Sequence, residues 1–247
     1  MKIIITAGGT SENIDTVRKI TNMSSGKLGK TIAEEFINRN EKIEKIYYIC
    51  TKHSEKPTHE KIEIIMVTDT NSLYFKVKEI LAQEKIDYFI HSMAVSDYTV
   101  DYVCSAKMLA SEIVNNCTDL SIESIENTII NNKAISPTNS KLPSTESDLI
   151  IKLKPTIKVI TELKKLDPNI FLVGFKLLTN VSEAELENAA LKLLSKNQCD
   201  LVVANDFAKI RDEIHPAFII SGAGNKIYAL TKKEIAEKLT KVLFENV

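Results

Sequence analysis

The stretch "KIIITAGGTSENIDTVRKITNMSSGKLGKTIAEEFINRN", residues 2–40, combines three patterns in one run of the chain. It opens with a short apolar, β-branched run at 2–6, which is typical of a strand buried on both faces of a sheet. It closes with a helical pattern over 26–40. A polar segment at 7–24, with glycines and serines, lies between the two, and we expect it to be one long loop. A strand followed by a helix predicts the first unit of a parallel α/β sheet.

Apolar runs typical of buried strands recur along the chain, with helical patterns between them. The runs are 45–51, 61–68, 87–95, 148–154, 170–178 and 200–207, and the helical patterns are 70–85, 157–166 and 182–197. Near the C-terminus, "AFIISGAGNKIYALT" (217–231) predicts a hairpin with Gly-Asn at its turn, and a helix follows over 232–246. We therefore predict an α/β fold, a Rossmann-like doubly wound and mainly parallel sheet with a C-terminal hairpin.

Residues 99–146 interrupt this rhythm. The segment is rich in asparagine, serine and threonine, although "IESIENTII" (122–130) is compatible with a short helix. A connection of this length without regular structure is usually a functional lid or a disordered linker. Because the strand patterns before and after it fit one sheet, we predict a single domain over 1–247 with a lid insertion at 99–146.

Composition limits the classes of function. The chain has 247 residues and 44% hydrophobic content, enough for a full core. Its 32 basic and 33 acidic side chains give a net charge of -1, so we expect no nucleic-acid and no membrane partner, and any anion site must be local. No apolar run approaches the roughly 20 residues of a spanning helix, and the N-terminal run is too short for a signal peptide, so we expect a cytoplasmic protein.

The polar segment before the first long helix has the chemistry of an anion site. Ser24 and Ser25 are natural helix caps, and Gly26 and Gly29 permit a close backbone approach. Free amides and the helix dipole would then point to one place at the carboxyl edge of the sheet, where α/β proteins bind ligands. From these residues alone, an ordinary cap without a ligand is an equal alternative. His91, at the end of an apolar run, is interpreted as a hydrogen-bonded strand-end residue rather than a catalyst.

The stretch 5–29 resembles a known family over its whole length, which is more than the spacing of its glycines and serines shows. "ITAGGTSENIDTVRKITNMSSGKLG" (5–29) resembles the N-terminal signature of phosphopantothenoylcysteine synthetase. The blocks "AVSDY" (94–98), "SKLPS" (140–144), "VGFKLL" (173–178) and "KNQCDLVVAND" (196–206) follow in the order of that family, so the resemblance covers essentially the whole chain. The given sequence has no counterpart of the flavin-dependent decarboxylase fused to many bacterial members, so the resemblance leads us to expect the stand-alone bacterial form, without flavin.

The resemblance implies a ligase of coenzyme A biosynthesis that works in two half-reactions. The carboxylate of 4′-phosphopantothenate reacts with CTP, with Mg as cofactor, to give an acyl-cytidylate and pyrophosphate, and the amine of cysteine then displaces CMP. ATP in place of CTP stays open, because base choice depends on backbone contacts. The resemblance also implies a homodimer, for which the sheet-edge hairpin at 216–231 offers exposed backbone and apolar side chains.

The family's functional residues are carried over by position. Asn22 would hold the pantothenate carboxylate and then the acyl carbonyl, and Lys141 matches the catalytic lid lysine. A proline interrupts the family's pattern beside Lys141, so Lys133 is the alternative. The residues for the substrate phosphate and carboxylate are Gly8, Gly9, Arg18, Ser24, Ser25 and Gly26. The nucleotide residues are Asp97, Thr156, Ile157, Lys158, Phe175, Lys192 and Lys196, and Asp97 is also the candidate Mg ligand.

Two other classes of function compete with this reading. A nicotinamide-dependent reductase would need a glycine-rich G-x-G-x-x-G or G-x-x-x-G-x-G turn, and the sequence contains neither. A nucleotide-binding regulator without catalytic activity stays open, and only an assay distinguishes it from the ligase.

Overall fold

The computed structural model describes residues 1–39, 42–131 and 148–245. Its contacts divide the chain into two compact units. We call Met1–Thr10, Asn22–Val95 and Ile157–Val247 the sheet unit, and Ser11–Thr21 with Ser96–Thr156 the insertion unit. The second unit therefore includes a segment close to the N-terminus, outside the predicted insertion 99–146.

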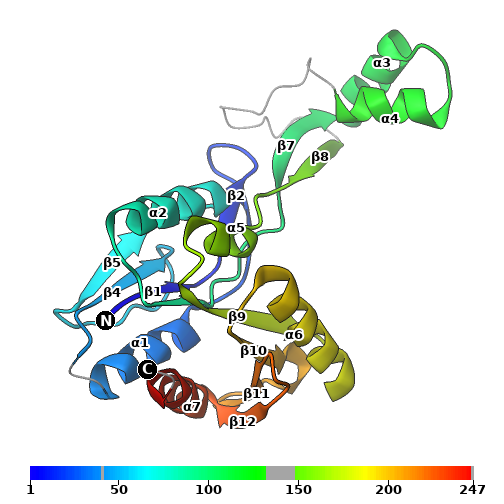
Figure 1. Cartoon of the computed structure of the whole chain (residues 1–247). Coiled ribbons are helices and arrows are strands. Elements are labelled where there is room, and N and C mark those ends of the chain that lie inside the picture. The colour runs from blue at the N-terminus through cyan, green and yellow to red at the C-terminus, as the bar shows by residue number, and fades with distance from the viewer. Residues whose placement is uncertain (40–41, 132–147, 246–247) are drawn as a thin grey trace. The chain divides into compact units, whose positions relative to one another are not determined.

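The sheet unit is built on one large sheet (Figure 1). In the described residues it has eight strands in the order β12-β11-β10-β9-β6-β1-β4-β5. All pairs from β5 to β10 are parallel, and β11 and β12 complete the sheet as an antiparallel hairpin. The bounds are β1 (Lys2–Ala7), β4 (Lys45–Cys50), β5 (Ile62–Met66), β6 (Tyr88–His91), β9 (Phe171–Leu178), β10 (Leu201–Asp206), β11 (Ile214–Ser221) and β12 (Lys226–Thr231). The predicted doubly wound, mainly parallel sheet with its hairpin is confirmed.

Helices cover both faces of this sheet. The bounds are α1 (Lys27–Arg39), α2 (Thr70–Gln83), α5 (Val159–Leu166), α6 (Glu183–Asn197) and α7 (Lys232–Glu245). Successive residues of a strand point to opposite faces. Ile3 and Ile5 of β1 accordingly pack in the core under α1 and α7, whereas Ile4 packs in the core under α2, α5 and α6. Among the described residues, no helix combines the length and the apolar character that crossing a bilayer requires.

The order of the strands indicates where a ligand would bind. After β1 the chain adds β4 and β5 on one side, and β6, β9 and β10 lie on the other. The strand order thus reverses between β1 and β6. In open α/β sheets, ligands bind at this switch point, beyond the carboxyl ends of the strands.

In its described residues, the insertion unit contains two small antiparallel sheets and two helices. Hairpin β2 (Ser11–Asn13) and β3 (Lys19–Thr21) forms one sheet, and β7 (Tyr98–Ser105) with β8 (Leu149–Pro155) forms the other. Between β7 and β8 lie α3 (Ala106–Asn116) and α4 (Ile122–Ile130), capped by the hydroxyls of Ser105 and Ser121. The expected short helix over 122–130 is confirmed.

Three sequence expectations differ from this structure. The run 148–154 was assigned to the parallel sheet, which is wrong, because β8 pairs with β7 outside that sheet. Lysines at 152 and 154 lie within its apolar run, and all its residues are exposed or half-buried, whereas strands of a parallel sheet are buried on both faces. The segment 7–24 is not one continuous loop, since β2 and β3 form a hairpin within it. The described part of 99–146 carries regular structure; Lys133 and Lys141 lie outside the described residues.

Candidate functional site

The turn after β1 is held against the end of β6 and the segment that contains Asn22. The amide of Thr10 donates to the carbonyl of Ala94 (3.1 Å), and the amide of Asn22 donates to the carbonyl of Thr10 (3.1 Å). The side chain of Asn22 donates through Nδ2 to the Ala94 carbonyl (3.0 Å). A Cβ on Gly9 would lie only 2.0 Å from the Asn22 carbonyl oxygen. Glycine is therefore required where these backbones meet.

A second close contact brings the start of α1 onto the same turn. Gly8 and Gly26 both have positive φ, 87° and 76°, and a Cβ on Gly26 would lie 3.2 Å from the Gly8 nitrogen. Buried Ser54 packs against Gly8 in this turn, and its hydroxyl lies 2.8 Å from that of Thr51. The first turn of α1 contains no acidic residue. Its N-terminal amides and dipole therefore favour an anion.

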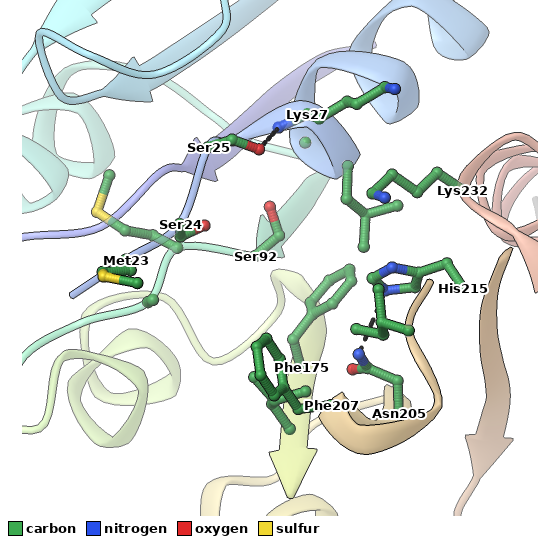
Figure 2. A pocket seen from close by; sticks show the side chains of 17 residues that line it. Met23, Ser24, Ser25, Lys27, Ser92, Phe175, Asn205, Phe207, His215 and Lys232 are labelled. Atoms are coloured by element: carbon green, nitrogen blue, oxygen red, sulfur yellow. Dashed lines mark hydrogen bonds between the residues drawn. The ribbon is translucent and has the colours of Figure 1, made fainter. Parts of the chain in front are cut away.

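A pocket of about 320 Å³ opens beside this helix end, at the carboxyl edge of the sheet (Figure 2). It lies wholly within the sheet unit. Its lining residues are Met23, Ser24, Ser25, Gly26, Lys27, Leu28, Gly29, Ser92, Met93, Ala94, Phe175, Leu177, Asn205, Phe207, Ile210, His215 and Lys232. Two lysines and no carboxylate stand among these described residues. The pocket is thus locally cationic in a chain of net charge -1.

The structure brings together part of the predicted site. Ser24, Ser25, Gly26 and Phe175 line the pocket. Gly8, Gly9 and Asn22 form the adjoining turn described above. The roles assigned to these residues stay predictions.

Four further predicted residues of the sheet unit lie outside the pocket lining. Ile157 is half-buried and packs against the core, and Lys158 is the residue before α5. Lys192 and Lys196 are exposed on α6. They lie in the half of the helix that leads to the amino end of β10, whereas the pocket is at the carboxyl ends of the strands.

The remaining predicted residues belong to the insertion unit. Arg18 forms an ion pair with buried Asp15, with Nη2 2.7 Å from Oδ2. The carbonyl of Asp97 accepts a hydrogen bond from the amide of Thr156 (3.0 Å). The hydroxyl of Thr156 donates to the carbonyl of Ser96 (2.5 Å). Among the described residues, no cluster of three or more potential metal-ligating side chains occurs.

Sequence reasoning missed Ser92, Asn205, His215 and Lys232, which also line the pocket. Asn205 follows four buried apolar residues near the end of β10. A polar residue that follows a buried apolar run at the carboxyl edge of the sheet is a signal that could have selected Asn205. His215 and Lys232 come from the antiparallel hairpin and the helix after it, where no comparable pattern exists.

Two buried histidines have strongly shifted pKa values. Nδ1 of His91 lies 2.9 Å from the hydroxyl of Thr6, which confirms the interpretation of His91 as a hydrogen-bonded strand-end residue. Burial lowers the pKa of His91 to about 4. Burial, with a smaller contribution from the charge of Lys232, lowers the pKa of His215 to about 4 as well. Both imidazoles are therefore neutral at physiological pH.

We expect these histidines to make stability sensitive to mild acid. Both pKa values lie below the ordinary value of 6.5, so between about pH 4 and pH 6.5 the unfolded chain binds more protons. The free energy of unfolding should therefore fall as pH is lowered from about 7 to about 5, by on the order of 2 kcal/mol for each histidine. Urea denaturation at a series of pH values measures this slope.

Matched variants assign the slope to particular residues. His91→Gln and His215→Gln should each flatten the dependence on pH, because one titrating group is removed. His53→Gln, at an exposed position, should leave the slope unchanged. An unchanged slope in the His91 and His215 double variant would contradict the prediction.

The chain resembles known proteins over nearly its whole length. The coenzyme A biosynthesis bifunctional protein CoaBC of Thermococcus kodakarensis is 32% identical over 239 residues, which are 96% of this chain and 49% of that protein. The chain thus spans about half the length of the curated relatives that it matches. The crystal structure of the DNA/pantothenate metabolism flavoprotein from Streptococcus pneumoniae matches with a TM-score of 0.84 and 34% identity, covering 100% of both chains.

A solved Cab2 mutant in complex with phosphopantothenate-cysteine has the same fold, with a TM-score of 0.69 and 18% identity over 99% of this chain and 85% of that chain. The model of the DNA/pantothenate metabolism flavoprotein C-terminal domain matches residues 1–131 and 131–246. This match spans both units of the structure, including the glycine turn and the start of α1. The chain therefore belongs to the family of the DNA/pantothenate metabolism flavoprotein C-terminal domain.

Proposed function

We propose that this chain is a ligase of coenzyme A biosynthesis that joins 4′-phosphopantothenate to cysteine at the expense of CTP. Family membership supports the proposal, as do the names of the relatives and the ligand in the Cab2 complex. The observation that carries it is the turn at the switch point, where Asn22 and the acid-free start of α1 adjoin a pocket without carboxylates. Such a place suits a substrate with a phosphate and a carboxylate.

The chemistry requires an activated carboxylate, because hydroxide is too poor a leaving group for direct amide formation. A carboxylate oxygen of phosphopantothenate attacks the α-phosphorus of CTP, and the bond to the β-phosphate breaks to release pyrophosphate. The amine of cysteine then attacks the acyl carbon. CMP leaves with the bonding electrons, and the amine loses a proton. The protein contributes by orienting the reactants and by stabilising charge on the reacting oxygens.

Asn22 is suited to the reacting carboxylate. Its Nδ2 is oriented by the hydrogen bond to the Ala94 carbonyl, which lies in the segment after β6. An uncharged amide can donate to a carboxylate and later to an acyl carbonyl without forming an ion pair that must be broken. The amides at the start of α1, with Ser24 and Ser25, would receive the phosphate.

Mg²⁺ belongs to the proposal as the usual companion of a nucleoside triphosphate. Mg²⁺ is commonly bound through one or two carboxylates and the phosphates of the substrate, rather than by a cage of protein ligands. The absence of a larger acidic cluster among the described residues fits that mode, with Asp97 as the protein carboxylate. When bound, the ion would neutralise charge on the triphosphate.

A homodimer is also part of the proposal. Strand β12 is an edge of the large sheet, and Ile227, Tyr228 and Leu230 on it are exposed. An exposed edge strand with apolar side chains is suited to pairing with a second chain.

A coupled assay tests the reaction. Pyrophosphate should appear only when nucleotide, Mg²⁺ and phosphopantothenate are present together, and phosphopantothenoylcysteine should appear only when cysteine is added. CTP should support faster turnover than ATP. Oxidation of NAD(P)H would contradict the proposal, and nucleotide binding without pyrophosphate release would favour a regulator without catalytic activity.

A further inference from the structure

His215 lines the pocket and carries a buried ring nitrogen that has no hydrogen-bond partner among the described residues. The residue is 8% exposed, and its Nε2 lies 3.2 Å from Nδ2 of Asn205. Its Nδ1 is a buried atom with no hydrogen-bond partner among the described residues. A buried polar atom without a partner is costly, so such atoms in folded proteins have a reason to be there, for example a ligand.

The Asn205 amide determines what Nδ1 can offer. An N–H group of Asn205 faces Nε2, so Nε2 accepts and the proton of the neutral ring is on Nδ1. Nδ1 is then a hydrogen-bond donor. The low pKa of His215, about 4, keeps the ring neutral and makes it a poor general base for the amine of an incoming nucleophile.

Lys232 supplies a cation to the same region. It is the first residue of α7, lines the pocket with His215, and makes no ion pair among the described residues. The positive charge of Lys232 contributes to the lowered pKa of the His215 ring. Figure 2 shows the Lys232 side chain reaching from α7 towards the pocket, near the His215 ring.

No carboxylate among the described lining residues neutralises the charge of Lys232. Lys27 comes from α1, and its ammonium lies 3.3 Å from the carboxylate of Glu213, which is exposed and does not line the pocket. An ammonium and a neutral N–H donor without an adjacent carboxylate form a set of donors only. The complementary group is an acceptor that carries negative charge.

We propose that Nδ1–H of His215 and the ammonium of Lys232 form a subsite for an anionic oxygen group of the substrate. A phosphate monoester and a carboxylate share this chemistry. Identification of the group as one end of phosphopantothenate rests on the proposed function. His215 is on β11 and Lys232 is on α7, so both lie far along the chain from Ser24. The N-terminal signature does not include either element.

Binding of simple anions tests the subsite without any ligase activity. In protein labelled with ¹⁵N at histidine, the His215 ring should be the Nδ1–H tautomer at neutral pH. Its nitrogen signals should shift saturably when inorganic phosphate or acetate is added, with potassium chloride at equal ionic strength as the control. A response to phosphate alone assigns a phosphate group, a response to acetate alone assigns a carboxylate, and a response to both supports an anion subsite that accepts either group. No shift with either anion would overturn the proposal.

Variants on α7 provide the matched comparison. Lys232→Met removes the ammonium but keeps the apolar stem, and it should weaken anion binding about tenfold, the expected effect of losing one charge-assisted hydrogen bond. Lys233→Met, at the next and highly exposed position, should bind as the wild type does. Equal binding by the Lys232 and Lys233 variants would overturn the proposal, and thermal unfolding verifies that both are folded.

Kinetics separates this inference from the proposed function. If the ligase reaction occurs, Lys232→Met should raise the KM for phosphopantothenate more than it lowers kcat. An unchanged KM in an active enzyme would reject the subsite while the proposed function stands. Saturable, Lys232-dependent anion binding in a protein without ligase activity would reject the proposed function while the subsite stands.

Discussion

Asn22→Ala should lower product formation by about 10²- to 10³-fold while the protein stays folded, the usual effect of removing one preorganised donor from a reacting oxygen. In the structure, Nδ2 of Asn22 is oriented by the Ala94 carbonyl at 3.0 Å, at the switch point of the sheet. Loss of that hydrogen bond costs only about 1 kcal/mol of stability. The effect on the reaction should therefore far exceed the effect on folding.

The two half-reactions locate the defect. Pyrophosphate release reports activation of the carboxylate, and phosphopantothenoylcysteine reports the attack by cysteine. Asn22→Asp should be impaired as strongly as Asn22→Ala, since its charge repels the substrate carboxylate. Asn38→Ala, at an exposed position on α1, is the control and should keep full activity. Rates of Asn22→Ala within about threefold of the wild type would remove Asn22 from the reacting site.

Gly9→Ala should abolish the activity and destabilise the fold. The new Cβ would lie 2.0 Å from the carbonyl oxygen and 2.9 Å from the carbonyl carbon of Asn22. These are backbone atoms, so no rotation of a side chain relieves the clash, and the segment with Asn22 must move. Overpacking of this kind costs typically about 1–3 kcal/mol. Displacement of Asn22 should also reduce product formation at least as much as its replacement by alanine.

Urea denaturation and the pyrophosphate assay measure the two effects of Gly9→Ala. The control is Gly222→Ala, whose Cβ would meet only Leu194, at an ordinary 3.6 Å. That variant should keep its activity and lose little stability. If Gly9→Ala were as stable and active as Gly222→Ala, the close approach of the two backbones would not be needed for the site.

Comparison of particular elements shows what could be predicted. The strands β1 and β4 and the helices α1 and α2 follow from runs of neighbouring residues, so the sequence sufficed for them. Strand β8 was predicted as a strand but placed in the wrong sheet. Two lysines, at 152 and 154, stand in its apolar run, and every residue of the strand is exposed or half-buried, unlike the buried runs of β1 and β4. The lysines were the local signal against burial on both faces.

The candidate site divides in the same way. Ser24, Ser25 and Gly26 were found because a cap and a glycine turn are local patterns, and Asn22 was found through the family signature that includes them. Asn205, His215 and Lys232 were not found, although they line the same pocket. The catalytic role of Lys141 stays a prediction, as it lies outside the described residues.

By itself, the sequence determined the α/β elements, the glycine turn before α1 and the family. Each of these depends on neighbouring residues, through the period of apolar side chains, the capping hydroxyls and the φ angles that glycine permits. Only the tertiary structure decided that β8 leaves the large sheet and that Ser11–Thr21 joins the insertion unit. It also decided that His215 and Lys232 meet the start of α1 in one pocket. Pairing of strands and burial of polar groups depend on which distant segments come together, and no local pattern encodes that choice.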